Sequence, residues 1–154
     1  MMGAWNSRAS LGSEAEDTLS EPAMLFSRIL LAVTGLVFFV HGLVCFIHPA
    51  TIGIESGLAM PTPSSVIEVR AEYGGLPIAL GLFFLAAALQ KIEVRTGLIV
   101  MLTALTGYAT ARIIALAITG HPDPYNLAAI TYELTTALLA LWALKRGQSP
   151  FSRG

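Results

Sequence analysis

Long blocks of apolar residues, rather than alternating apolar and polar positions, dominate the chain. Four blocks approach or exceed the about 20 residues that a helix needs to cross a bilayer. They are Met24–Ile47, Ile67–Leu89, Gly97–Ile118 and Pro124–Leu144. The segments between them are short and rich in Pro, Gly, Ser and charge, which is typical of loops. The pattern predicts an all-α integral membrane protein, a bundle of four transmembrane helices.

The composition supports a membrane location. Of the 154 residues, 55% are hydrophobic and 12% are charged, and the mean hydropathy is +0.69. A soluble domain carries about 25% charged residues. The net charge of −1 gives no sign of a nucleic-acid partner. The lipid bilayer is therefore the partner that we expect, with one transmembrane domain over residues 24–146.

The two ends of the chain differ from the apolar blocks. Residues 1–23 are polar and mildly acidic, and they lack the basic start and short apolar core of a cleaved signal peptide. We expect a disordered N-terminal tail over 1–23, a first span that is retained, and a C-terminal tail over 147–154. The single cysteine, Cys45, excludes a disulfide within the chain.

The distribution of basic residues predicts the orientation. An even number of spans places both termini on one side, and seven of the nine Lys and Arg residues lie on that side. Arg70 and Arg112 lie on the other. The positive-inside rule then places both termini in the cytoplasm. In a bacterium this means a multi-pass protein of the inner membrane, with loops 48–66 and 119–123 facing outward.

Capping signals mark the expected starts of two helices. Ser65, followed by Glu68 at the third position, fits a capping box at the start of the second span. Asp123 before Pro124 is typical of a helix start, and it predicts where the fourth span begins. Asn126 is a competing cap for that span, so its first residue stays open.

Prolines and small residues predict where helices end, bend and touch. His48-Pro49 and His121-Pro122 are expected to end the first and third spans, because the residue before a proline avoids helical geometry. Pro77 lies inside the second span and should distort it, since it has no N–H to donate. Small residues four apart allow close helix contact in lipid, as at Gly75/Ala79 and Gly107/Ala111/Ala115.

The polar residues inside the spans share one depth. At a rise of about 1.5 Å per residue, His41, Glu72, Arg112 and Glu133 lie roughly 7–14 Å below the outer ends of their spans. The inner half of the predicted bundle has no such layer. A charge at the centre of a span costs about 2.5–3.5 kcal/mol, so we expect these groups to face each other.

Arg112 is the natural centre of this layer. Its guanidinium suits two carboxylates, and it is expected to pair with Glu72, Glu133 or both. Neighbouring hydroxyls could complete the hydrogen bonding, and these belong to Tyr73, Tyr108 and Tyr132. Two interpretations remain open: a structural clasp that fixes helix register, or an outward-opening pocket that touches a ligand or moves protons.

Other polar residues near the layer are secondary candidates. Glu68 is explained by the capping box, and Arg70 either reaches lipid headgroups or contacts another span. His41, Cys45 and His48 share one helix face, but three ligands without a fourth are weak evidence for a metal. We expect no metal and no cofactor. Patterns typical of hydrolases, nucleotide-binding proteins and zinc proteases do not occur in the sequence.

The segment EVRAEYGGLPIALGLFF, from Glu68 to Phe84, together with FIHPA and GLAMPTPSS before it, resembles a known family. These are small four-helix bacterial membrane proteins catalogued as a domain of unknown function, family 4345. The resemblance covers about residues 25–145, and it includes Arg112 in the third span and Glu133 in the fourth. It implies a four-helix bundle in an inner membrane and no established reaction.

The expected function follows from the polar layer and the lack of extramembrane mass. The first hypothesis is a non-enzymatic protein that binds a small lipophile in an outer-leaflet pocket, or serves as an accessory subunit of a larger membrane complex. The alternative is an isomerase-like membrane enzyme, in which Glu72 or Glu133 transfers a proton and Arg112 polarises a lipophilic substrate. Whether the chain is an enzyme stays uncertain, and the non-enzymatic hypothesis is preferred.

Overall fold

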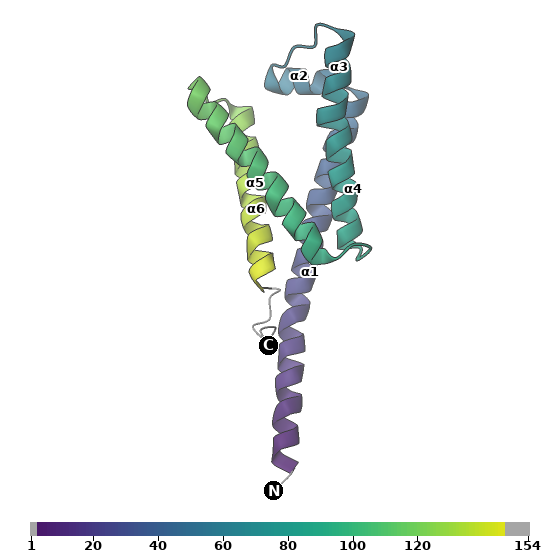
Figure 1. The fold of residues 1–154 in the computed structure, drawn as a ribbon, viewed down its shortest axis with the longest axis vertical. Coiled ribbons are helices and arrows are strands. Elements are labelled where there is room, and N and C mark those ends of the chain that lie inside the picture. Colours follow the sequence, from purple (N-terminus) through teal and green to yellow (C-terminus); the bar gives the residue numbers. More distant parts are fainter. Residues whose placement is uncertain (1–2, 147–154) are drawn as a thin grey trace.

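A computed structural model describes the backbone of residues 3–146 and the side chains of residues 21–54 and 56–146. Its helices, in chain order, are α1 (Gly3–Ile47), α2 (Ala50–Ser56), α3 (Pro63–Val69), the π-helix η1 (Arg70–Gly75), α4 (Leu76–Ala88), α5 (Val94–Thr119) and α6 (Pro124–Arg146) (Figure 1). α1 begins inside the segment 1–23, for which a disordered tail is expected. That tail stays a prediction, and the expected tail over 147–154 lies outside the described residues.

Four helical segments are long and apolar enough to cross a membrane, as the sequence predicts. They are Glu21–Ile47, Pro63–Ala88, Val94–Thr119 and Pro124–Arg146. Their bounds lie within four residues of the predicted ones. No strand occurs among the described residues. The fold class is thereby confirmed: the chain is an all-α membrane protein with four spans. Its orientation in the membrane stays a prediction.

The spans form two antiparallel hairpins, which meet at one end and diverge toward the other (Figure 1). The first hairpin consists of α1 with α3, η1 and α4, and the second consists of α5 with α6. Where they meet, Phe26 of α1 packs edge-on against Trp142 of α6, with ring centroids 4.9 Å apart. At the divergent end, the short helix α2 lies across the first hairpin and extends toward the second.

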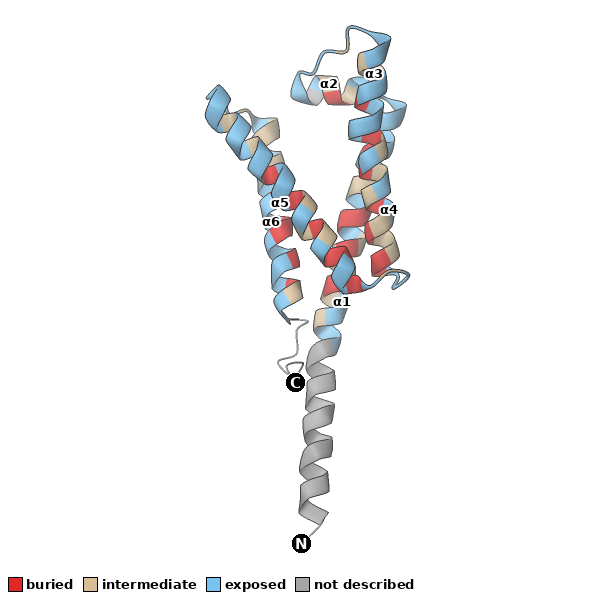
Figure 2. Ribbon diagram, in the orientation of Figure 1, coloured by how far each residue is buried: buried red, intermediate tan, exposed pale blue. Residues whose placement is uncertain are grey.

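The main core lies where the hairpins meet, and Figure 2 shows most buried residues in that region. Phe84 and Leu31 of the first hairpin pack there against Met101 and Leu105 of the second, and all four are fully buried. A smaller cluster lies at the divergent end. It contains Cys45, Ile52 and Val69, with Tyr125 and Met60 packed against it. The polar layer lies between these two apolar clusters.

Two glycine pairs hold the first hairpin together. A Cβ built on Gly35 would lie 2.9 Å from the carbonyl oxygen of Gly81, and one on Gly42 would lie 2.7 Å from that of Gly74. Both distances are too short for a real side chain. Since each pair of glycines on a helix is seven residues apart, one face of α1 meets one face of η1 and α4 along about two turns. This close approach is the packing role that small residues have in lipid.

The small residues singled out from the sequence do not have this role. A Cβ on Gly107 would meet nothing within 4 Å, and one on Gly75 would approach only the Arg70 carbonyl oxygen, at 3.8 Å. The prediction was wrong because a spacing of four recurs on every helix face and does not reveal which face is covered.

The second span begins earlier than predicted. Thr62 is its N-cap, and the Thr62 hydroxyl accepts a hydrogen bond from the Ser65 amide at 3.2 Å. The Ser65 hydroxyl accepts from the Thr62 amide at 3.1 Å, which completes a capping box. Ser65 therefore occupies the third helical position, at the end of the box and not at its start, and Glu68 lies outside the box. Pro63 favours this start because its ring presets the backbone of the first helical position.

The ends of the other spans agree in part with the predictions. α1 ends at Ile47, directly before His48-Pro49. α5 ends at Thr119, because Gly120 adopts a left-handed conformation, with φ +69°, and donates its amide to the Leu116 oxygen at 2.9 Å. Gly120 and not His121-Pro122 therefore terminates the third span, and glycine is the residue that this conformation favours.

Asp123 caps the fourth span. Its Oδ1 accepts a hydrogen bond from the Asn126 amide at 3.0 Å, and its Oδ2 accepts from the Asn126 side-chain amide at 2.6 Å. The prediction of Asp123 as cap is confirmed, and the competing cap Asn126 is the third residue of the helix.

Pro77 has its effect one turn before its own position. The chain between Arg70 and Gly75 is a π-helix, in which the Leu76 amide donates to the Ala71 oxygen five residues earlier. Pro77 has no N–H to donate to the regular series of helical hydrogen bonds. It lies in the first turn of α4, where the backbone N–H groups have no partner within the helix. The predicted distortion therefore takes the form of one wide turn. This turn carries Glu72 and Tyr73.

Candidate functional site

An ion pair between α5 and α6 forms the centre of the candidate site. Arg112 donates from Nε to Oε1 of Glu133 at 2.9 Å, and from Nη1 to Oδ1 of Asn126 at 2.8 Å. Glu133 and Asn126 are seven residues apart on α6, so both point from the same face toward α5. The Arg112 side chain is 27% exposed and that of Glu133 is 8% exposed. A largely buried ion pair thus joins the two helices of the second hairpin.

Further interactions extend from the ion pair toward the divergent end of the second hairpin. Asn126, which accepts from Arg112, donates in turn to Asp123. The Arg112 guanidinium also lies over the Tyr125 ring, 5.7 Å from its centroid, which is a cation–π contact. Since Tyr125 packs against the apolar cluster of the first hairpin, it connects the Arg112 network to that hairpin.

Asp123 lies outside the spans, where its titration bears on the helix cap. The hydrogen bonds from the Asn126 side chain and amide lower the pKa of the Asp123 carboxyl below its ordinary value, because they stabilise the charged form. The ionised carboxylate is thus the form that caps α6.

One oxygen of Glu133 has no partner. Oε2 is buried and accepts no hydrogen bond from any described residue. Glu133 as a whole is 6% exposed. A buried polar atom without a hydrogen bond costs about 1–3 kcal/mol, and more when the group is charged. The carboxylate is therefore anchored at Oε1 by Arg112 and has unused acceptor capacity at Oε2.

Tyr108 brings the two hairpins into one electrostatic neighbourhood. It lies one turn before Arg112 on α5, and its hydroxyl interacts electrostatically with Arg112, Glu133, Glu72 and Tyr73. The last two residues lie on η1 of the first hairpin. Four of the predicted site residues therefore lie within electrostatic range of Tyr108. Arg112 pairs with Glu133, and no hydrogen bond or ion pair joins Glu72 to a described residue.

The remaining predicted residues lie around this group or apart from it. The Tyr132 hydroxyl interacts with Thr136 on its own helix and with Thr34, which is buried on α1. His41 contacts Cys45 one turn later, with 3.6 Å between Nε2 and Sγ, and no hydrogen bond or ion pair joins it to Arg112. Glu68 and Arg70 are exposed in the first turns of the second span. The shared depth of the polar layer stays a prediction, and His41 contacts its own helix rather than the other groups of the layer.

Sequence reasoning missed Asn126 and Tyr125 as parts of the site. A signal was available, because Asn126 lies two turns before Glu133 and hence on the same helix face. Tyr125 carries no such signal, since its place depends on how α6 meets the first hairpin. Among the described side chains, no three His, Cys, Asp or Glu residues lie close enough to hold a metal ion.

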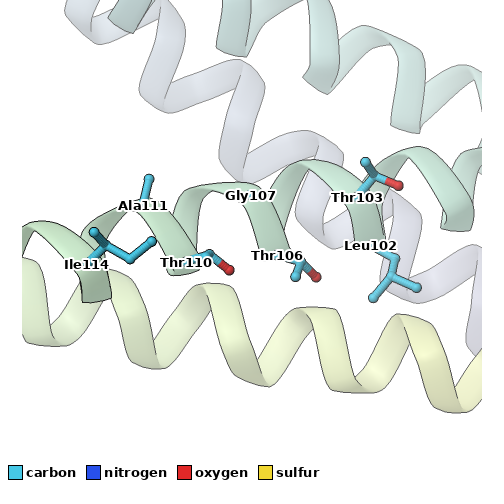
Figure 3. A pocket seen from close by; sticks show the side chains of 7 residues that line it. All are labelled: Leu102, Thr103, Thr106, Gly107, Thr110, Ala111 and Ile114. Carbon is cyan, nitrogen blue, oxygen red and sulfur yellow. The ribbon is translucent and has the colours of Figure 1, made fainter.

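A groove on α5 is distinct from the polar cluster. It is open and mostly apolar, and Figure 3 shows its lining residues along successive turns of one helix. They are Leu102, Thr103, Thr106, Gly107, Thr110, Ala111 and Ile114. The hydroxyl of Thr103 donates to the Ile99 carbonyl oxygen of its own helix at 2.9 Å, so it is already satisfied. No charged side chain lines the groove, so it is a weaker candidate than the cluster around Tyr108.

Comparison with known proteins gives a family without an activity. The profile of a family described as "Domain of unknown function (DUF4345)" matches residues 26–144. This range includes most of the first and fourth spans, the whole of the second and third, and every residue of the polar layer. No curated protein and no solved structure matches the chain.

Proposed function

Since the chain belongs to the DUF4345 family, whose description names no activity, we propose a function from the polar layer: the protein binds a small lipophile with a polar head group. The head group would lie at the depth of Arg112 and Glu133, between η1 and α5. The tail would lie along the apolar surfaces where the hairpins diverge. The observation that carries this proposal is the buried, unpartnered oxygen of Glu133.

The cost of the polar layer supports a binding role over a purely structural one. A structural clasp between α5 and α6 needs only Arg112 and one carboxylate, and Glu133 already supplies that carboxylate. Glu72 adds a second carboxylate at a similar depth without a direct partner among the described residues. Ionisable groups inside a membrane are expensive, and they mark functional sites by default. A structural role alone explains neither Glu72 nor the unused oxygen of Glu133.

The local backbone also supports the proposal. Glu72 and Tyr73 lie on a π-helical turn, and such turns are frequent at functional sites. The turn is held against α1 by the contact of Gly74 with Phe46, where a Cβ would lie 2.8 Å from the Phe46 Cβ. Glu72 therefore projects from a backbone segment with a fixed position.

The test is purification of the full chain in native-lipid discs, followed by mass spectrometry of bound small molecules and proteins. We expect a lipophile at a defined ratio to the wild-type chain, and its loss from Glu133→Gln. Glu21→Gln makes the same chemical change at the start of the first span, far from the polar layer, and this variant should retain the lipophile. If wild type and Glu133→Gln carry the same molecules as empty discs, the binding proposal is wrong. A stoichiometric protein partner instead of a lipophile would support the accessory-subunit role.

The isomerase-like alternative has one observation in its favour. A carboxylate with a free oxygen next to an arginine can accept a proton while the arginine polarises a substrate. It predicts turnover of the bound lipophile by the purified chain alone, with loss of turnover in Glu133→Gln. Release of the bound molecule in unchanged form would support binding without catalysis.

A further inference from the structure

A small cavity lies between the two hairpins, at the end where they meet. Its volume is about 130 Å³, and α1, α5 and α6 contribute its walls. Three residues of its lining, Val94, Leu98 and Ala143, also belong to the main core. No residue of the polar layer lines this cavity, so it is separate from the site of the proposed function.

The lining combines apolar walls with one cation. Met24, Leu98 and Leu144 supply apolar surface from three helices. The Ser27 hydroxyl donates to the Ala23 carbonyl oxygen at 2.8 Å, so its hydrogen is already used. Arg95 lines the cavity and is exposed, and no hydrogen bond or ion pair joins its side chain to another described residue. The guanidinium therefore keeps its donors for an anion, and its geometry suits a phosphate.

The charge around the cavity has the sign that an anion requires. The segments that contribute to it are 21–28, 91–98 and 142–146. Their charged residues are the basic Arg28, Lys91, Arg95, Lys145 and Arg146, and the acidic Glu21 and Glu93. Glu93 accepts a hydrogen bond from the Thr96 hydroxyl at 3.0 Å and forms no ion pair with Arg95. The excess of basic side chains attracts an anionic group to this end of the bundle.

Trp142 indicates the depth of the cavity in the membrane. It directly precedes Ala143 and Leu144 of the lining, and 43% of the residue is exposed. The Arg146 guanidinium lies over its ring, 4.9 Å from the centroid. Tryptophan is enriched where the bilayer meets water, and a nearby arginine reaches the lipid head groups. We therefore expect the cavity at the level where the phosphates of lipids meet their acyl chains.

The size and lining favour a lipid over a soluble anion. Pockets that enclose a drug-sized ligand have about 300–1,000 Å³, so a cavity of about 130 Å³ takes only part of a lipid. A soluble phosphate would leave the apolar walls without a partner. Basic pockets between transmembrane helices are typical sites for anionic lipid head groups.

We infer that the cavity binds an anionic phospholipid. Its phosphate lies at Arg95, and the upper part of one acyl chain lies against Met24, Leu98 and Leu144. Since these residues come from both hairpins, the bound lipid contacts both of them where they meet.

The test measures binding to the full chain in detergent micelles by native mass spectrometry. The probes are phosphatidylglycerol and phosphatidylcholine with identical acyl chains, and glycerol phosphate, which has no acyl chain. At about 0.15 M salt, a Debye length of about 8 Å limits attraction by distant charges. We expect phosphatidylglycerol to bind at least about fivefold more tightly than phosphatidylcholine, because each nearby Lys or Arg contributes about this factor. Glycerol phosphate that binds as tightly as phosphatidylglycerol would overturn the lipid as occupant.

Two matched variants distinguish a site from a positively charged surface. Arg95→Gln should weaken phosphatidylglycerol binding about tenfold, because it removes charge-assisted hydrogen bonds. Lys145→Gln should weaken it less than about threefold, because Lys145 is exposed at the same end but does not line the cavity. Both residues are exposed, so their replacement leaves the core intact. Equal losses in the two variants would overturn the inference.

A third variant tests the apolar part of the site. Ala23→Leu extends a lining residue into the cavity and should weaken phosphatidylglycerol about tenfold with no change of charge. Unchanged binding in Ala23→Leu would contradict the place given to the acyl chain.

The outcome is independent of the function proposed above. Glu133→Gln should bind phosphatidylglycerol as the wild type does, because Glu133 does not line the cavity. Equal binding of phosphatidylglycerol and phosphatidylcholine by the wild type would overturn the present inference and leave the proposed lipophile site standing.

Discussion

At the scale of single residues, Arg112 is the cation at the centre of the polar network. It joins α5 to α6 through Glu133 and Asn126, and it contacts Tyr125, which packs against the first hairpin. An arginine is better suited than a lysine, because its planar guanidinium directs donors to several acceptors at once. One side chain therefore serves both the stability of the second hairpin and the electrostatics of the candidate site.

Removal of Arg112 should destabilise the protein more than removal of the whole pair. Arg112→Leu leaves the Glu133 charge buried without compensation, which costs roughly 3 kcal/mol, the lower end of the range for buried pairs, since Arg112 is 27% exposed. The double variant Arg112→Leu/Glu133→Leu should recover most of this loss. Thermal unfolding in lipid discs measures both. A double variant as unstable as the single one would show that the pair itself supplies the stability.

Low pH should destabilise the first turn of α6. The folded-state pKa of Asp123 is lowered by its hydrogen bonds to Asn126, so the cap contributes stability above the ordinary carboxyl pKa. That contribution is lost as the pH falls through the lowered folded-state value. Hydrogen exchange of the Asn126 amide, referred to an amide in the middle of α6, should therefore accelerate below about pH 4. In Asp123→Ala the relative exchange rate should be high at every pH. If that variant keeps the pH dependence of the wild type, Asp123 is not the group that titrates.

At the scale of elements, the glycine pairs explain why the first hairpin behaves as one unit. Gly35 and Gly42 of α1 meet Gly81 and Gly74 on the other helix, and the backbones are in contact at both points. Without water to drive apolar association, such close packing is a main source of helix attraction in lipid. In the second hairpin, buried alanines of α6 pack with Met101 and Leu105 of α5, and Arg112 adds polar contacts.

Substitutions at two glycines, one in close contact and one in open space, should show whether the close packing stabilises the first hairpin. Gly81→Val places a side chain against the backbone of Phe39 and Gly35, where even a Cβ would lie 2.6 Å and 2.7 Å away. We expect a loss of at least about 1–3 kcal/mol through overpacking. Gly107→Val points into open space and should change the stability by less than about 0.5 kcal/mol. Equal losses at both positions in thermal unfolding would contradict the packing described for the first hairpin.

The sequence predicted which segments form the spans better than it predicted the helix ends and the contacts between helices. Runs of about twenty apolar residues identify spans because lipid requires every backbone group to be bonded internally, which leaves the helix as the solution. Helix ends were predicted well where a local signal decides, as at Asp123. The π-helix, the short helix α2 and the glycine contacts were not predicted. Each depends on which face of a helix meets another, and apolar residues on all faces of a span conceal that information.

At the scale of the whole molecule, two hairpins that meet at one end give the candidate site its place. The core at that end holds α1 and α4 against α5 and α6, and the polar layer lies farther out, where the hairpins diverge. The depth of the layer comes from residue counting and stays a prediction. The choice of Glu133 over Glu72 as the direct partner of Arg112 was not predictable, because it depends on the distance between the hairpins.

Labelling of single cysteines tests the predicted orientation. In a Cys45→Ser background, Ser64→Cys should react with a membrane-impermeant maleimide added to cells whose inner membrane is intact. Lys91→Cys, in the loop between the hairpins, should react only after that membrane is permeabilised. Both residues are exposed in the structure, so access depends on the side of the membrane. The reverse pattern would place both termini outside.

The wide turn at Arg70–Gly75 also has a consequence for the history of the gene. A turn with hydrogen bonds five residues apart holds one residue more than a regular α-helical turn, and each residue rotates an α-helix by about 100°. A single inserted codon in an ancestral straight helix would produce it, because the wide turn takes up the extra residue, which would otherwise rotate one part of the helix by about this angle relative to Gly81 and the rest of α4. Relatives that lack the extra residue should therefore have a regular helix here and keep both the glycine contact at Gly81 and the neighbours of the segment from Thr62 to Arg70.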